Sequence, residues 1–456
     1  MARELTTMPA DEAWQPFEPS SASPFDRRAA AHLFRRAGFS ANSRQLDEAV
    51  AAGPRAVVKQ LVASAADEGK FAGEMKSFAD TVLAVNNPES LAAWWLYRMR
   101  HSPAPLLEKM TLFWHGHFAT SAAKVTEVPL MYRQNRLLRQ YALGDFEKMV
   151  QGIARDPAML LYLDSATNRK THPNENFARE VMELFCLGLG NYTEKDIQEL
   201  ARCFTGWEIQ YGEFKFNPYQ HDRGSKTVLG KSGDMDGDEG IRAILERPAA
   251  AEFLCTKLVR YFVADDVPIT KELIAPLATN MRESKYVSAP VVETILTSRL
   301  FFSPDVRGQK VRSPVELGVG FLKSLDAAAN MQDLARQLRE VGQLPLFPPN
   351  VKGWNGGREW INSSTLLGRA NLVRRMVDQS GLRLGDQPAD DYFASLGWKS
   401  DEQIVAGLCE LLLAALPPAD VRDRLKAELA SKEGGRSGAL RRTLVTLGSL
   451  PEFQLS

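Results

Sequence analysis

The chain has 456 residues, 44% of them hydrophobic, and its 56 basic and 56 acidic residues cancel. This composition is typical of a soluble globular protein of one to three domains and excludes a disordered chain. The neutral charge argues against a bulk nucleic-acid binder, although it leaves room for a local basic patch. No apolar run reaches the roughly 20 residues that span a bilayer, and the four cysteines lack zinc-finger or disulfide-framework spacing.

Helical periodicity covers almost the whole chain and predicts a mainly α fold, an irregular array of about 15 helices. The helices expected in the first part of the chain cover residues 24–37, 42–61, 90–100, 106–114, 128–143, 145–154, 157–163, 174–187 and a segment opening at Thr193. The period fails at residues 208–217, where the alternating IQYGEFKF predicts one small β-hairpin. Residues 219–240 resemble a loop, after which helices resume.

We expect an irregular N-terminal extension over residues 1–24, a main helical domain over 25–380 and a C-terminal helical subdomain over 381–456. Residues 219–240 and 344–362 are long irregular stretches that still contain aromatic and apolar residues. Loops beyond about 12–15 residues are uncommon unless they are functional or disordered. These two stretches are therefore expected to be ordered loops that cover another part of the molecule.

The motif Trp114-His115-Gly116-His117-Phe118 carries two histidines separated by one glycine. In an extended chain their imidazoles would point the same way and form two legs of a zinc, iron or copper site. In a helix they would diverge by about 200°. The alternatives are a histidine that bonds the last carbonyls of a helix, or an acid–base role.

The predicted helix 174–187 is polar on one side. Glu180 and Glu183 are three residues apart and share a face, so they can ligate a metal or act as acid and base. Asn176 lies one turn before Glu180, and Arg179 is spaced to pair with Glu183. The alternative interpretation is a solvated face with ion pairs along it.

Two irregular segments add further candidates. His221-Asp222 precedes Lys226 in a Gly-Ser-Lys loop, a context typical of a site and uncommon in a core. Trp354 and Trp360 offer flat faces that stack on sugar rings or bases. The alternative is that both indoles fill the core while the neighbouring glycines make turns.

Six blocks occur together in this chain: HLFRRAGF from His32, EKMTLFWHGHFATS from Glu108, DPAMLLYLD from Asp156, NENFAREVMELFCLGLGNYTEKDIQELARCFTGW from Asn174, HDRGSKTVLG from His221 and PPNVKGWNGG from Pro348. Together they resemble the bacterial family called domain of unknown function 1800, from near residue 25 to the C-terminus. The resemblance implies no established activity. Members are often encoded beside a sulfatase-like protein, a candidate partner, and many are exported. The polar, acidic start of this chain lacks the parts of a signal peptide, which favours the cytoplasm.

The sequence therefore predicts a hydrolytic enzyme with one polar pocket that is built from these segments and acts on a saccharide or other polar polymer. The candidate catalytic residues are Arg179, Glu180, Glu183 and Asp222, the candidate substrate-binding residues are Asn176, Lys226, Trp354 and Trp360, and the candidate metal ligands are His115, His117 and His221. A divalent zinc, iron or copper ion is the cofactor expected. The alternatives are a non-catalytic scaffold with a buried polar network and an oxidative iron or copper protein.

Overall fold

A computed structural model describes residues 5, 8–66, 68–265, 268–379 and 381–456. Within these residues the protein is mainly α, with 61% of residues helical, 24 α-helices and three small two-stranded antiparallel sheets. The predicted fold class is confirmed. The helices are more numerous than expected because several predicted stretches divide at a turn, as residues 42–61 do at Gly53.

The elements follow one another along the chain with short connections. The first half contains α1 (Ala10–Ala13), α2 (Arg27–Gly38), α3 (Ser43–Ala52), α4 (Pro54–Ala63), η1 (Ser64–Ala66), α5 (Gly69–Val85), α6 (Pro88–His101), α7 (Pro105–His117), α8 (Val128–Tyr141), α9 (Phe146–Ala154), α10 (Pro157–Tyr162), η2 (Ser165–Thr167), α11 (Asn176–Glu180), the π-helix η3 (Val181–Cys186), α12 (Glu194–Cys203), β1 (Trp207–Gln210), β2 (Glu213–Phe216), β3 (Lys226–Val228) and β4 (Lys231–Gly233). The second half contains α13 (Gly237–Leu245), α14 (Pro248–Phe262), α15 (Lys271–Glu283), α16 (Ser288–Thr297), α17 (Pro314–Ser324), α18 (Met331–Glu340), η4 (Gly357–Trp360), α19 (Ser363–Gln379), β5 (Arg383–Leu384), β6 (Gln387–Pro388), α20 (Ala389–Ser395), α21 (Asp401–Leu412), α22 (Ala419–Leu429), α23 (Gly435–Ser449) and α24 (Pro451–Gln454).

Local sequence signals explain where many helices begin. Asp26, Asn42 and Asp156 each accept a hydrogen bond from a backbone N–H in the first turn of α2, α3 and α10, which satisfies an otherwise unpaired donor. Proline occupies the first turn of α6, α7, α8, α14 and α17, where its missing N–H costs nothing.

The hairpin expected over residues 208–217 is confirmed, with Trp207 opposite Phe216 and Gln210 opposite Glu213. The stretch read as a loop contains a second hairpin, in which β3 pairs with β4. Its strands have three residues each, which is too short for alternation to be visible in the sequence.

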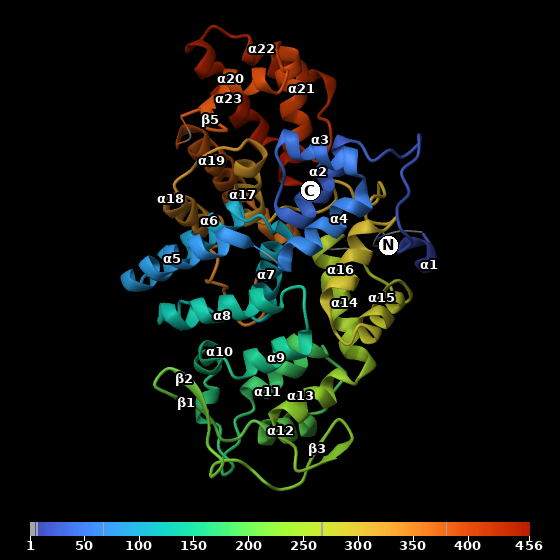
Figure 1. Cartoon of the computed structure of the whole chain (residues 1–456), viewed down its shortest axis with the longest axis vertical. Coiled ribbons are helices and arrows are strands. Elements are labelled where there is room, and N and C mark those ends of the chain that lie inside the picture. The colour runs from blue at the N-terminus through green and yellow to red at the C-terminus, as the bar shows by residue number, and fades with distance from the viewer. Residues whose placement is uncertain (1–4, 6–7, 67, 266–267, 380) are drawn as a thin grey trace.

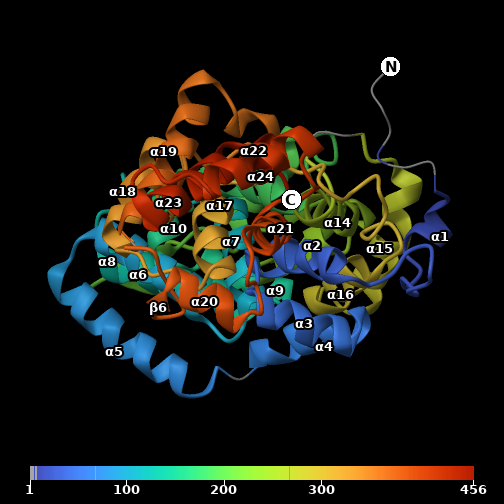
Figure 2. The same ribbon diagram turned by 90° about the horizontal axis from the view of Figure 1, so that it is seen from above.

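The molecule is elongated, and its ends are built from different parts of the chain (Figure 1). Helices α19–α23 lie at one end of the long axis with β5, and α9–α13 lie at the other with β1, β2 and β3. The C-terminal helices are anchored by contacts of α23 with α19 and of α21 with α2. Viewed from above, α5 lies on the outside of the molecule (Figure 2).

Helix α7 lies in the interior of the molecule and contacts α2, α4, α6 and α8. All its residues after Pro105 are buried except Gly116, including both histidines. The N-terminal extension also packs onto the body, because the Trp14 indole N–H donates to the Leu273 carbonyl at 2.7 Å. In the described residues no helix is long and apolar enough to cross a bilayer.

Candidate functional site

Helix α7 determines the directions of the two histidines of the WHGHF motif. The helix continues through Gly116 and ends at His117, so the extended alternative does not occur and the imidazoles diverge. His115 Nε2 accepts a hydrogen bond from the Leu346 N–H at 3.0 Å. Burial lowers the pKa of His115 to about 3, which keeps this ring neutral. His115 is therefore a packing residue that anchors the loop after α18.

His117 points to the other side and joins two elements that are distant in sequence. Its Nε2 lies 2.9 Å from the Phe185 carbonyl and its Nδ1 lies 3.2 Å from Lys257 Nζ. Because a carbonyl only accepts, Nε2 carries the proton and Nδ1 accepts from the lysine. Burial, and then the charge of Lys257, hold the pKa of His117 well below its ordinary value. The ring is a neutral bridge between η3 and α14.

The carbonyls bound here belong to a π-helix, a conformation that is frequent at functional sites. Lys257 Nζ donates to the Leu184 carbonyl at 2.9 Å, beside the Phe185 carbonyl that His117 binds. Both carbonyls lie near the end of η3, where intrahelical donors run out. Lys257 and His117 supply those donors from α14 and α7.

Lys257 itself is unusual because burial lowers its pKa to about 8. Its Nζ lies 4.7 Å from the centre of the Phe253 ring, and no carboxylate of the described residues lies within ion-pair distance. The two bonds to Leu184 and His117 use two of its three N–H donors. One position on the nitrogen is left for a bound molecule.

Lys257 and His117 line a cleft of 370 Å³ over the end of α7. The residues that give the cleft its character are four cations and two half-buried indoles: Lys257, Arg260, Lys310, Lys352, Trp354 and Trp360. The lining acids Asp265 and Glu316 are already paired, with Lys310 and Lys109 respectively. Among the described lining residues, Lys257, Arg260 and Lys352 therefore give the cleft an excess of positive charge.

A close backbone contact places the tryptophan loop on α7. Gly353 has φ +77°, and a Cβ added to it would lie 2.2 Å from the Gly116 carbonyl oxygen. Only glycine permits this approach, which places the Trp354 ring 5.7 Å from that of His115 between centroids. The expected ordered loop is present, and it covers the end of α7.

The two glutamates of the predicted polar helix differ in environment. Burial, and then the neighbouring Glu183, raise the pKa of Glu180, while Lys352 opposes the rise. Glu183 accepts a hydrogen bond from the Tyr192 hydroxyl at 3.3 Å. Neither glutamate lines the cavity, although the charge of the lining residue Lys352 acts on Glu180.

The other polar residues of this helix make local contacts at the surface. Arg179 donates to both carboxylate oxygens of Glu194 at 2.8 Å and also pairs with Glu175. The Asn176 amide donates to the Leu163 carbonyl at 3.3 Å. The alternative interpretation of a solvated face with ion pairs fits Arg179.

The HDRGSK segment forms a separate cluster around β3. His221 Nδ1 lies 2.9 Å from the Thr205 carbonyl, and Asp222 accepts from Arg202 at 2.7 Å. Lys226, fully buried, binds Asp234 at 2.9 Å. None of the three predicted residues of this segment lines the cleft.

The expectation of one pocket built from all these segments is thus corrected. The structure brings His117, Trp354 and Trp360 together but not His221, Asp222 or Lys226. Across the described residues no three His, Cys, Asp or Glu side chains are grouped closely enough to hold a metal ion. The physical reason is that each histidine points to a different backbone partner.

Sequence reasoning missed Lys257, together with Arg260 in the same helix. Helix α14 carries no motif and reads as an ordinary amphipathic helix. The one available signal is that Lys257 directly precedes the buried pair Leu258 and Val259 and follows the buried Leu254 by three residues. A lysine at the edge of an apolar face usually extends its ammonium to water. Here the cleft and η3 surround it.

Comparison with known proteins gives a family and no activity. The profile of the family described as "Protein of unknown function (DUF1800)" matches residues 32–455, and the chain therefore belongs to this family. No curated protein and no solved structure matches the chain.

Proposed function

We propose that this DUF1800 protein is a hydrolytic enzyme that binds an acidic saccharide in the cleft over α7 and uses Lys257 for proton transfer. The observation that carries the proposal is a half-buried lysine at the wall of a polar cleft, with no carboxylate partner among the described residues. A lysine desolvated in this way is a common acid–base group in active sites.

The substrate class follows from the two kinds of side chain that line the cleft. Trp354 and Trp360 are half buried, and an indole offers a flat apolar face to a sugar ring. Arg260 and Lys352 are exposed cations without an ion-pair partner in the described chain. A sugar with a carboxylate or sulfate group satisfies both features.

The pKa of Lys257, about 8, suits proton transfer in both directions. As ammonium it donates a proton to the leaving oxygen while the bond from carbon to that oxygen breaks. A water adds its hydroxyl to the carbon and releases a proton, which restores the ammonium. His117 positions the lysine through Nδ1, so that the amine left after proton donation takes up the proton released by water.

No metal takes part in the proposed reaction. The three predicted ligands His115, His117 and His221 use ring nitrogens for protein hydrogen bonds, and they belong to three different contacts. A zinc-dependent hydrolase or an oxidative iron or copper protein has no grouped set of ligands in the described residues. Partnership with a sulfatase-like protein stays a prediction.

The test is a small panel of chromogenic substrates with wild type and Lys257→Gln. We expect turnover of a 4-nitrophenyl glucuronide, weaker turnover of the neutral 4-nitrophenyl glucoside, and loss of both in the variant. Lys59→Gln is the matched control, because Lys59 is exposed and lies outside the cleft. Absence of glucuronide turnover, or equal turnover in Lys257→Gln, contradicts the proposal.

One observation favours a second candidate, a non-catalytic scaffold. His117 and Lys257 both bind carbonyls of η3, so the pair also acts as a cap that fixes helix packing. Under this alternative Lys257→Gln lowers the unfolding temperature, and no chromogenic substrate is turned over by wild type. Under the enzyme proposal turnover is lost while most stability remains.

A further inference from the structure

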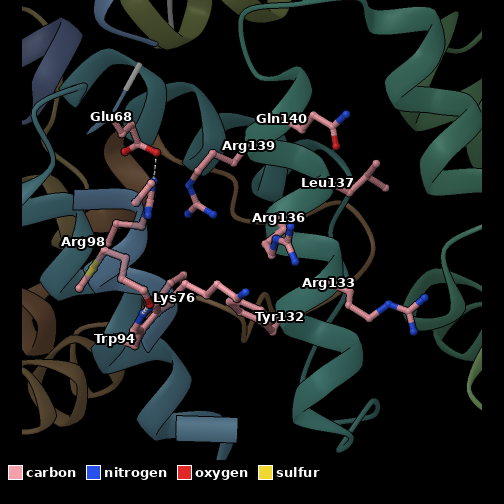
Figure 3. A pocket seen from close by; sticks show the side chains of 12 residues that line it. Glu68, Lys76, Trp94, Arg98, Tyr132, Arg133, Arg136, Leu137, Arg139 and Gln140 are labelled. Carbon is pink, nitrogen blue, oxygen red and sulfur yellow. Dashed lines mark hydrogen bonds and ion pairs between the residues drawn. The ribbon is translucent and has the colours of Figure 1, made fainter. Parts of the chain in front are cut away.

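A second cavity, of 550 Å³, lies between α5, α6 and α8 (Figure 3), and its lining shares no residue with the cleft over α7. Five basic side chains line it: Lys76, Arg98, Arg133, Arg136 and Arg139. Among the described residues, Glu68 is the single acid in this lining. Positive charge is therefore concentrated at this cavity, although the chain as a whole is neutral. Only those cations that lack an acidic partner are available to bind an anion.

Two of the arginines, Arg98 and Arg139, are paired with the buried carboxylate of Glu108. Glu108 is fully buried and accepts from Arg98 at 2.6 Å, from Arg139 at 2.7 Å and from the Trp95 indole at 2.9 Å. Burial alone would raise the pKa of Glu108, but Arg139 and Arg98 hold it below its ordinary value. Arg98 also pairs with Glu68. These two arginines are held rigidly in place.

A third arginine, Arg133, is paired with residues that do not line the cavity. Arg133 donates to Glu213 of the β1–β2 hairpin at 2.7 Å and to the Gly212 carbonyl at 3.2 Å. In Figure 3 its guanidinium points away from the other basic groups. It connects α8 to the hairpin and leaves the cavity to the remaining two cations.

Arg136 and Lys76 have no acidic partner among the described residues. Arg136 extends from α8 into the space between the helices, and Lys76 reaches toward Tyr132 from the opposite side (Figure 3). The Arg136 guanidinium carbon lies 5.9 Å from the centre of the Tyr132 ring. Two unpaired cations on different helices, with an aromatic face beside them, are therefore placed around one small space.

We propose that this cavity is a binding site for a tetrahedral dianion, which is a free phosphate or sulfate ion or a phosphate monoester on a ring. A dianion neutralises both unpaired cations, and a guanidinium fork matches its oxygens in pairs. The size of the cavity suits a small molecule, whereas the neutral chain provides no extended basic track for a nucleic acid.

The test uses isothermal titration calorimetry of the full chain with inorganic phosphate, inorganic sulfate and phenyl phosphate. The variants are Arg136→Gln and Lys76→Gln, which change different walls of the cavity. Arg374→Gln and Lys59→Gln are the matched controls, because both residues are exposed and lie outside this cavity. Thermal unfolding of each variant checks that the exposed substitutions leave the fold intact.

We expect saturable binding of about one anion, weakened about 10–100-fold by Arg136→Gln and about tenfold by Lys76→Gln, with both controls unchanged. Tighter binding of phenyl phosphate than of phosphate identifies an ester as the ligand, and equal binding identifies the free ion. No saturable binding of any probe at millimolar concentration overturns the proposal. Binding that persists undiminished in both cavity variants also overturns it, since the cleft over α7 would then hold the anion.

Discussion

The cleft over α7 and the cluster around β3 contain the same kinds of residue, yet their charges are arranged differently. In the β3 cluster every predicted ion has a partner: Asp222 binds Arg202, and Lys226 binds Asp234. In the cleft, Lys257 and Arg260 have none within ion-pair distance in the described residues. Paired ions hold a loop in place, whereas an unpaired cation beside a cavity is available to a ligand.

The two regions also differ in what their histidines reach. His221 binds the nearby Thr205 carbonyl, 16 residues away in sequence. His117 binds Lys257, 140 residues away, and the carbonyl of a π-helix. The first contact stabilises a local turn, and the second fixes the direction of a titratable amine at a cavity wall. This difference is what the following predictions test.

The largest contrast is expected in turnover of the 4-nitrophenyl glucuronide. Lys257→Gln should lower kcat by about 10²–10⁴-fold, the usual contribution of a general acid or base. Asp222→Asn should leave kcat unchanged, because its carboxylate is committed to Arg202 outside the cleft. Steady-state kinetics of the two variants measure the difference. Equal losses of kcat in both variants would contradict the assignment of catalysis to the cleft and not to the β3 cluster.

The next largest effect is expected from Gly353→Ala. Its Cβ would meet the Gly116 carbonyl at a positive φ, so we expect about 2–4 kcal/mol of destabilisation and a raised KM as the tryptophan loop shifts. Gly212→Ala is the matched control, with φ +74° and no atom within 4 Å of the new Cβ. It should cost about 1 kcal/mol and leave KM unchanged. Chemical denaturation and kinetics measure both, and equal costs would show that the close approach is unimportant.

A smaller effect is expected on the stability of Asp222→Asn. The hydrogen bond and charge of Arg202 lower the pKa of Asp222, so this ion pair stabilises the fold above the unfolded pKa of about 3.9. We expect the variant to lose about 1 kcal/mol at pH 7. As the pH falls through the folded pKa, the difference between wild type and variant should disappear. A constant difference down to pH 2 would contradict the pairing seen here.

The smallest effect is expected from Arg179→Gln. Arg179 was a candidate catalytic residue, but its guanidinium pairs with Glu194 and Glu175 at the surface. The substitution should change unfolding free energy by no more than about 0.5 kcal/mol and should not change kcat. A tenfold loss of kcat would contradict this expectation and show that Arg179 contributes to catalysis.

The sequence predicts the local structure of this protein well and its long-range contacts poorly. Helical periodicity, N-caps and the alternation at residues 208–217 identify most elements, because those signals lie within a few residues of one another. The tryptophan loop was expected to be ordered because its aromatic residues argue against disorder. Its cover over α7 depends on Gly353 meeting Gly116, a contact that no local pattern reveals.

The candidate site shows the same limit. His117, Trp354 and Trp360 were identified from unusual residues in polar segments, and they do meet in one cleft. Lys257 was missed because its environment is created by η3 and α7, which lie far from it in sequence. His115 was a candidate ligand because Gly116 suggested a break, whereas α7 continues one residue further and directs the ring to Leu346.

The central claim is that Lys257 is an amine of lowered pKa that is accessible from the cleft. Competitive acetylation over a pH series, read by mass spectrometry at each lysine, measures this without any substrate. We predict that Lys257 reacts with a midpoint near pH 8, well below the ordinary lysine pKa of about 10.4. A Lys257 that reacts only near the ordinary lysine pKa, or that no reagent reaches while the fold is intact, contradicts this claim.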